Sequence, residues 1–145
     1  MLCKKPIQRN IQDEKNRKFF TSQTQEVFKM KIAVIRIHGQ VKVRREIAET
    51  LYRLRLRRKY SCIVLENNEA EKMGMVKKVK DFVAYGEIDE DIYKKLVEKR
   101  KTNIQNFFRL HPPRKGIESK KHFGVGKGVL GDNKKEINKL IERML

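Results

Sequence analysis

Residues 31–66, KIAVIRIHGQVKVRREIAETLYRLRLRRKYSCIVLE, decide the fold of this chain of 145 residues. The stretch begins with Lys31 to His38, a segment rich in isoleucine and valine that is followed by Gly39. This pattern predicts a strand. Its apolar residues do not alternate cleanly with polar ones, so we expect both faces of this strand to be covered, as in the centre of a sheet. Ser61 to Glu66 predicts a second strand.

Between these two strands the hydrophobic period changes to that of a helix. The helical stripe, which we expect to face the core, consists of Val43, Ile47, Leu51 and Leu54. The other faces carry more cationic side chains than solubility requires, and these either contact a partner or are simply solvated. They are Arg44, Arg45, Arg53, Arg55, Arg57, Arg58 and Lys59.

A second helix and a third strand are expected between residues 68 and 88. Asn68 and Glu71 resemble a capping box at the start of that helix. Val83 to Ile88 predicts the short third strand, so the order of elements to this point is β-α-β-α-β. The inward-facing residues of the second helix are expected to be Met73, Val76, Val79 and Val83.

Acidic and basic side chains mark a third helix that begins near residue 89. Residues 89–91 are acidic at its positive end and residues 99–101 are basic at its negative end, as the helix dipole favours. The paired carboxylates do not indicate acid–base catalysis, because the sequence offers no nucleophile or second catalytic group near them. Asn133 and Glu136 form another cap-like pair before a terminal amphipathic helix. Its stripe consists of Ile137, Leu140, Ile141 and Met144.

Residues 107–131, FFRLHPPRKGIESKKHFGVGKGVLG, are called the basic segment here because they contain six lysines and arginines and a single acid, Glu118. The segment also holds Pro112-Pro113 and five of the eight glycines of the chain. Such a composition buries too little apolar surface to offset the entropy of ordering the backbone, so alone we expect a mobile loop. Either the segment stays a solvated loop or, as the overall charge favours, it becomes ordered against a polyanion. Docking of the terminal helix on the core would hold it at both ends.

Two glycine motifs in the basic segment do not have their usual meaning. Gly126 to Gly131 matches G-x-G-x-x-G, but the residues up to Leu145 supply neither the second strand nor the acidic residue of a dinucleotide site. Backbone amides at this helix N-terminus remain suited to an RNA phosphate. His122 to Gly126 resembles the aromatic–glycine core of an RNA-recognition motif, but it lies outside the β-α-β part and is rejected as a sheet signature. Phe123 remains a candidate for stacking on a base.

The charge of the whole chain predicts a negatively charged partner. Lysine and arginine number 36 against 18 aspartates and glutamates, so the formal net charge is +18. Nucleic acid is the commonest partner for such an excess. An anionic membrane is the rival, but no apolar run approaches the ~20 residues of a spanning helix, and no secretory signal is recognised.

Cysteines and histidines show no metal or redox motif. Cys3 and Cys62 lack the spacing of zinc or redox pairs, and Cys62, inside an apolar run, is expected to be a small buried residue. His38, His111 and His122 lie far apart and show no ligand spacing. We therefore expect no metal site and a reducing cytoplasm.

Residues 1–29 form a basic N-terminal extension without helical or strand periodicity, which we expect to be largely disordered. Its charge of +4 suits contact with a phosphate backbone and is equally compatible with an inert tail; a transit peptide is disfavoured because such peptides contain few acids. The expected organisation is therefore an extension (1–29), a core (30–88) and a C-terminal extension packed on it (89–145).

Several motifs, in the right order, resemble the family of protein thirty of the large ribosomal subunit, in its archaeal type, whose eukaryotic counterpart is called protein seven. The match covers about Met30 to Leu145, and bacterial relatives stop near the third strand. The matching motifs are KIAVIRIHG, VRREIAETLYRLRL, CIVLEN, MGMVKKVKDFVAYGEID, FFRLHPPRKG and KKEINKLIERML.

This resemblance implies an α+β, ferredoxin-like fold with a β-α-β-α-β core and a C-terminal extension of helices and basic loop. It implies a non-catalytic constituent of the large ribosomal subunit in the cytoplasm that binds and stabilises large-subunit ribosomal RNA. Proximity to 5S RNA and to other large-subunit proteins is expected, with no cofactor, small-molecule substrate or membrane. Archaeal members begin close to Met30, so we expect the protein isolated from ribosomes to begin at or near that residue.

Carried over by position, the RNA-facing residues implied by the resemblance lie mainly in the basic segment. On the first helix the implied positions are Arg44 and Arg57. In the basic segment they are Arg109, Pro112, Pro113, Arg114, Lys115, Gly116, Lys120, Lys121, His122, Phe123, Gly126, Lys127 and Gly128.

Two other functions remain open from the residues alone. A free-standing RNA chaperone or regulator would show the same charge, but it would not stay with large subunits in high salt. A small nucleotide-dependent enzyme can use the same scaffold, and it would need a concave pocket with convergent polar groups, which the sequence does not show.

Overall fold

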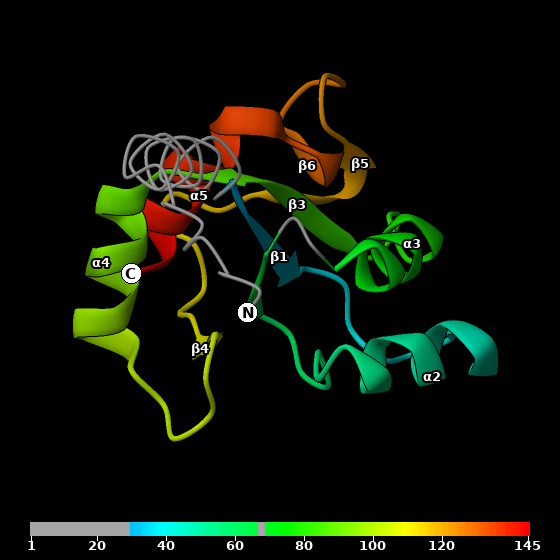
Figure 1. The fold of residues 1–145 in the computed structure, drawn as a ribbon. Helices are drawn as coiled ribbons and strands as arrows, with labels where there is room; N and C mark the ends of the chain where they lie inside the picture. Colours follow the sequence, from blue (N-terminus) through cyan, green and yellow to red (C-terminus); the bar gives the residue numbers. More distant parts are fainter. Residues whose placement is uncertain (1–29, 67–68) are drawn as a thin grey trace, which may run out of the picture.

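The computed structural model describes residues 30–66 and 69–145, which form one sheet with helices on both faces (Figure 1). The strand order is β4-β2-β1-β3-β6-β5. The strands are β1 (Lys31–Arg36), β2 (Ser61–Glu66), β3 (Val83–Ile88), β4 (Phe107–Arg109), β5 (Glu118–His122) and β6 (Gly128–Asp132). The helices are α2 (Arg45–Arg53), α3 (Ala70–Lys78), α4 (Glu90–Arg100) and α5 (Ile137–Met144), the last preceded by a 3-10 turn, η1 (Lys134–Glu136).

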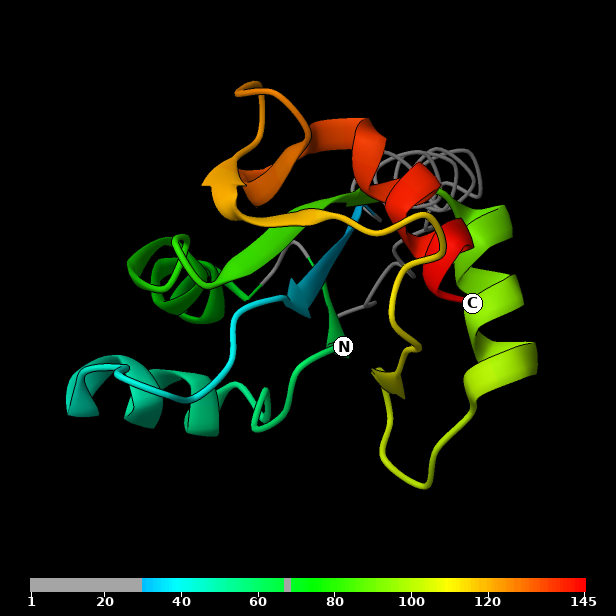
Figure 2. The same cartoon turned by 180° about the vertical axis from the view of Figure 1, so that it is seen from behind.

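Strand β1 is the centre of the sheet and pairs antiparallel with β2 and with β3. Val34 faces the cluster that contains Leu51 of α2 and Val76 of α3. Ala33, the residue before it, faces a cluster that includes Ile137 of α5. Figures 1 and 2 show α2 and α3 on one side of the sheet and α4 and α5 on the other. The prediction that both faces of this strand are covered is confirmed.

The predicted strands and helices of residues 31–100 are found close to their expected bounds. The second and third strands have the predicted limits, and the first ends at Arg36, two residues before His38. Leu51 is fully buried as expected, although α2 begins only at Arg45. Val83 belongs to β3, so its assignment to the inner stripe of the second helix was wrong.

Of the two predicted capping pairs, one falls partly outside the described residues and the other is not found. The N-cap position of α3 is Glu69, without a side-chain cap, and Asn68 lies outside the described residues. Asn133 does not cap α5, because its buried Nδ2 donates to the carbonyl oxygen of Val129 at 2.9 Å and η1 precedes the helix. The Asn133 side chain therefore ties β6 to the turn that follows it.

The basic segment was expected to be a loop, and that expectation was wrong in part, because it contains β4, β5 and β6. The segment buries more apolar surface than its charge suggested: Phe108, Leu110 and Leu130 join the cluster beneath α4 and α5. Strand β4 pairs with β2, and β6 runs parallel to β3. Residues in register with an existing sheet gain backbone hydrogen bonds that composition alone does not reveal.

The end of α5 fixes the proline turn of the basic segment. The carbonyl oxygens of Met144 and Arg143 accept hydrogen bonds from the backbone N–H groups of His111 and Arg114, each at 3.0 Å. The Arg143 guanidinium also donates to the carbonyl oxygens of Arg114 and Gly116. These bonds hold residues 111–116 against the last turn of the helix.

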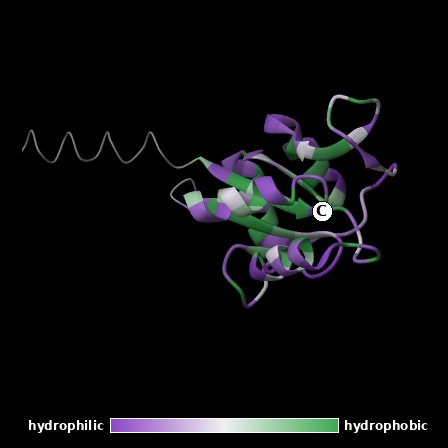
Figure 3. Cartoon of the chain, turned by 90° about the vertical axis from the view of Figure 1, so that its right-hand side faces the viewer, coloured by the Kyte–Doolittle hydropathy of each residue, from purple (hydrophilic) through white to green (hydrophobic). Residues whose placement is uncertain are grey.

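Hydrophobic residues are concentrated along the strands, whereas the connecting loops are mostly hydrophilic (Figure 3). Cys62 is fully buried in this core, as predicted, and burial raises the pKa of its thiol to about 12. Within residues 30–66 and 69–145, no helix has the length and apolar character needed to cross a membrane.

Gly86 of β3 allows η1 to lie directly on the sheet. A Cβ atom at this position would lie 2.2 Å from the carbonyl oxygen of Lys134, so either the strand or the turn would have to move. Gly86→Ala is therefore expected to lower the free energy of unfolding by about 1–3 kcal/mol in urea denaturation. Gly74→Ala in α3 is the control, since no atom lies within 4 Å of its Cβ position; it should raise stability by up to about 1 kcal/mol. Equal stability of the two variants would contradict the packing described here.

Candidate nucleic-acid interface

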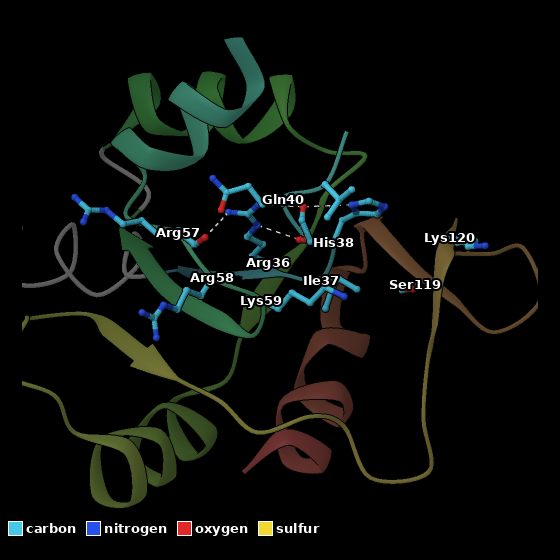
Figure 4. A pocket seen from close by; sticks show the side chains of 11 residues that line it. Arg36, Ile37, His38, Gln40, Arg57, Arg58, Lys59, Ser119 and Lys120 are labelled. Carbon is cyan, nitrogen blue, oxygen red and sulfur yellow. Dashed lines mark hydrogen bonds between the residues drawn. The ribbon is translucent and has the colours of Figure 1, made fainter. Parts of the chain in front are cut away.

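A groove of about 510 Å³ opens where β1 ends, and it is called the basic groove here (Figure 4). Three segments that lie far apart in the sequence form it. Residues 36–41 follow from β1, residues 57–59 lead into β2, and residues 119–120 belong to β5.

The buried guanidinium of Arg36 joins the first two of these segments. It donates hydrogen bonds to the carbonyl oxygens of His38 and Gly39, both at 3.0 Å. It also donates to the carbonyl oxygens of Leu56 at 2.6 Å and Arg57 at 2.8 Å. Burial lowers the pKa of Arg36 from its ordinary value, because desolvation disfavours the charged form. Carbonyl dipoles rather than a carboxylate compensate this charge, so Arg36 sets the spacing between the two loops (Figure 4).

Four exposed cationic side chains line the basic groove: Arg57, Arg58, Lys59 and Lys120, called the groove cations here. None of them forms an ion pair with a carboxylate of residues 30–66 and 69–145. Among the residues that the structure describes, none with an acidic side chain lines the groove. Like charges held together without a counter-charge give a positive potential, which attracts an anion.

Two contacts orient the side chains of Arg57 and Lys59. The Arg57 guanidinium lies over the ring of Tyr52, 4.0 Å from its centroid, and a stacked arginine keeps its edge free for a phosphate. The aliphatic stem of Lys59 packs on Gly39, where Cε lies 2.9 Å from the position that a Cβ atom would take. In the part of the chain that the structure describes, no group of three or more metal-ligating side chains occurs. The groove is therefore suited to electrostatic binding of phosphates.

The structure brings together two of the residues proposed from the sequence, Arg57 and Lys120. Sequence reasoning did not assign Arg36, Arg58 or Lys59 to the site. Arg58 and Lys59 were visible as part of the cationic run before the second strand. An arginine inside the apolar run of β1 was the available signal for Arg36.

The residues predicted from the sequence in the proline turn (112–116), together with Arg44 and Arg109, lie outside the groove lining. Arg109 is exposed on β4, at the edge of the sheet. Residues 112–116 form the turn held by α5, and Gly116 there has a φ of +66°, which favours glycine. Arg44 is exposed immediately before α2.

The residues predicted around the β5–β6 turn have mixed surroundings. Lys121 forms an ion pair with Glu118 at 3.0 Å, and His122 Nε2 lies 3.3 Å from a carboxylate oxygen of Asp81. Gly128 is buried, and a Cβ atom there would lie 2.2 Å from the carbonyl oxygen of His122, so close packing of the backbone explains this glycine. The remaining three, Phe123, Gly126 and Lys127, are exposed.

Comparison with known proteins gives consistent matches. The family model of ribosomal protein L30p/L7e matches residues 32–83. The large ribosomal subunit protein uL30 of Methanococcus maripaludis is 37% identical over 156 aligned positions, which cover 80% of this chain and 100% of the relative. The uL30 protein of Archaeoglobus fulgidus is 34% identical over 151 positions, covering 77% of this chain and 98% of the relative. That of Methanosphaera stadtmanae is 31% identical, covering 78% and 99%.

The order β1-α2-β2-α3-β3, with helices packed on the sheet, defines an α+β protein of the ferredoxin-like class. Within that class the comparisons identify a single family. The chain belongs to the L30p/L7e family of ribosomal proteins, which confirms the resemblance found in its motifs.

Proposed function

We propose that this chain is a structural constituent of the large ribosomal subunit that binds large-subunit ribosomal RNA through the basic groove. The observation that carries the proposal is that the four groove cations gather in one concave surface, with no acid beside them among the described residues of the lining. Family membership and the names of the archaeal relatives support the placement in the large subunit. The protein would thus reside on cytoplasmic ribosomes.

Binding of this kind depends mainly on phosphate contacts. Each cation that neutralises a phosphate releases counterions and adds to affinity without reading sequence. Shape then selects the site, because Arg36 fixes the two loops of the groove relative to each other. The groove therefore supplies affinity, and its rigid geometry supplies selection.

Cationic side chains outside the basic groove are expected to add RNA contacts. Beyond the groove, the exposed cations Arg44, Arg109, Arg114, Lys115 and Lys127 extend the positive surface and can reach neighbouring phosphates. Proximity to 5S RNA and to other large-subunit proteins is expected from the family resemblance. The proposal assigns the chain no catalytic step and no cofactor.

Sedimentation of the full chain with large subunits through a high-salt gradient tests the proposal. A constituent held by many phosphate contacts and by the assembled particle is expected to stay with the large-subunit peak. Release of most of the protein to the top of the gradient would instead favour a free-standing RNA-binding regulator, whose electrostatic binding is weakened by salt.

A further inference from the structure

A second groove, of about 660 Å³, lies between α3 and η1 over β3 and is called the apolar groove here. Its lining includes the side chains of Ile32, Met73, Tyr85 and Phe123. The first three also pack against the core cluster beneath α2 and α3, so the groove continues that core to the surface. In Figures 1 and 2, α3 and the β5–β6 turn lie toward the same end of β3.

The charges of this groove differ from those of the basic groove. Three lysines in its lining are matched by three acids, whereas the lining of the basic groove carries cations alone. The acids disfavour a phosphate backbone, and balanced charges instead complement a polypeptide with both signs. The lysines are Lys77, Lys134 and Lys135, and the acids are Glu87, Asp132 and Glu136.

The apolar part of the groove lining contains residue types that are common at protein–protein interfaces. Aromatic residues and methionine, such as Phe123 and Met73, are enriched at the centre of such interfaces, with charged groups at the rim. Phe123 is 43% exposed and Val125, two residues further along the same turn, is 58% exposed. Apolar side chains that gather at the surface inside a polar rim mark sites of protein contact.

Several contacts hold the walls of the apolar groove in place before any partner binds. The imidazole Nε2 of His122, 3.3 Å from a carboxylate oxygen of Asp81, connects the end of β5 to the segment between α3 and β3. The backbone N–H of Asn133 donates to the carbonyl oxygen of Tyr85 at 2.8 Å, which fixes the start of η1 on the sheet. A preformed groove loses little conformational entropy on binding.

We propose that the apolar groove is a docking site for a neighbouring protein, which inserts an apolar side chain above Tyr85 from a segment that carries both positive and negative charges. The inference rests on the proposed function in one respect, since it places the neighbour in the assembled large subunit. It adds a protein-binding face that is separate from the basic groove.

Photocrosslinking in assembled large subunits tests this docking site. The probe is p-benzoylphenylalanine in place of Phe123, with the same group in place of Val41 as a marker for the basic groove, where Val41 is 78% exposed. We expect the Phe123 probe to give one protein–protein product that resists ribonuclease, and the Val41 probe to give an RNA product.

Each outcome of the crosslinking has a definite meaning. RNA products at the Phe123 position, a crosslink to residues 1–29 of the same chain, or no crosslink in assembled subunits would overturn the docking site. If the Val41 probe alone fails to reach RNA, the proposed function fails and the docking site stands. The two proposals can therefore fail independently.

A substitution in the groove lining provides a second readout. Met73→Glu places a charge among Ile32, Tyr85 and Phe123, so the yield of the protein crosslink is expected to fall about tenfold or more. Gln105→Glu makes the same change of charge at an exposed position outside the groove and should leave the yield unchanged. Circular dichroism confirms that both variants are folded, and an unchanged yield in folded Met73→Glu would contradict the proposal.

Discussion

Replacing Arg36 with methionine is expected to lower the free energy of unfolding by about 3–5 kcal/mol. Methionine keeps much of the volume of the side chain but leaves four backbone carbonyl oxygens without their donor. These carbonyls belong to two loops that the guanidinium holds together, so the loss affects both walls of the basic groove. Urea denaturation of the full chain measures the change.

The matched control is Arg53→Met on α2. Arg53 is exposed and pairs with Glu49 at 2.7 Å one helical turn away, and a surface pair of this kind contributes at most about 0.5 kcal/mol. Arg36→Lys should fall between the two variants, because an ammonium group keeps the charge but cannot reach all four acceptors. If Arg36→Met were as stable as Arg53→Met, the guanidinium would not be the element that joins the loops.

Replacing all four groove cations with glutamine is expected to weaken binding to large-subunit ribosomal RNA by about 30- to 1,000-fold. This range follows from about 0.5–1 kcal/mol for each exposed phosphate contact. The slope of log affinity against log salt should fall by about three to four units, since each lost contact removes about one. Filter binding at several salt concentrations measures both quantities.

The control for this experiment changes the charge equally on α4 and just after it. Four exposed lysines, Lys94, Lys95, Lys99 and Lys101, are replaced by glutamine. This variant should keep a salt slope close to that of the wild type. Equal losses in the two variants would show that net charge, and not the basic groove, determines binding.

A third variant replaces the sequence-predicted cations Arg114, Lys115, Lys121 and Lys127 with glutamine. Its loss of RNA affinity is expected to be intermediate, because Lys121 is already paired with Glu118.

The strands of the core were predictable because their signals are local. Residues 31–36, 61–66 and 83–88 are short apolar runs that end at polar or glycine positions, and the structure has strands there. Strands β4, β5 and β6 have three to five residues each and lie among cations and glycines. Strands β4 and β6 form because β2 and β3 offer partners that are distant in sequence, and β5 then pairs with β6. No local pattern predicts such pairing.

The candidate site was predictable only in part for the same reason. Charge identified Arg57 and Lys120 as candidates, but their meeting in one groove depends on the strand order that places β5 beside β6. The role of Arg36 depends on loop carbonyl oxygens 20 and 21 residues away. The apolar groove combines β1, α3, β3 and η1 with the β5–β6 turn, so no single stretch of sequence contains its pattern.

A density map of the large subunit that contains this chain tests most directly whether the basic groove binds RNA. We predict that the guanidinium and ammonium groups of the groove cations lie at hydrogen-bonding distance from phosphate oxygens of ribosomal RNA. A map in which the basic groove faces solvent or another protein, while the RNA contacts the outer face of α4, would contradict it.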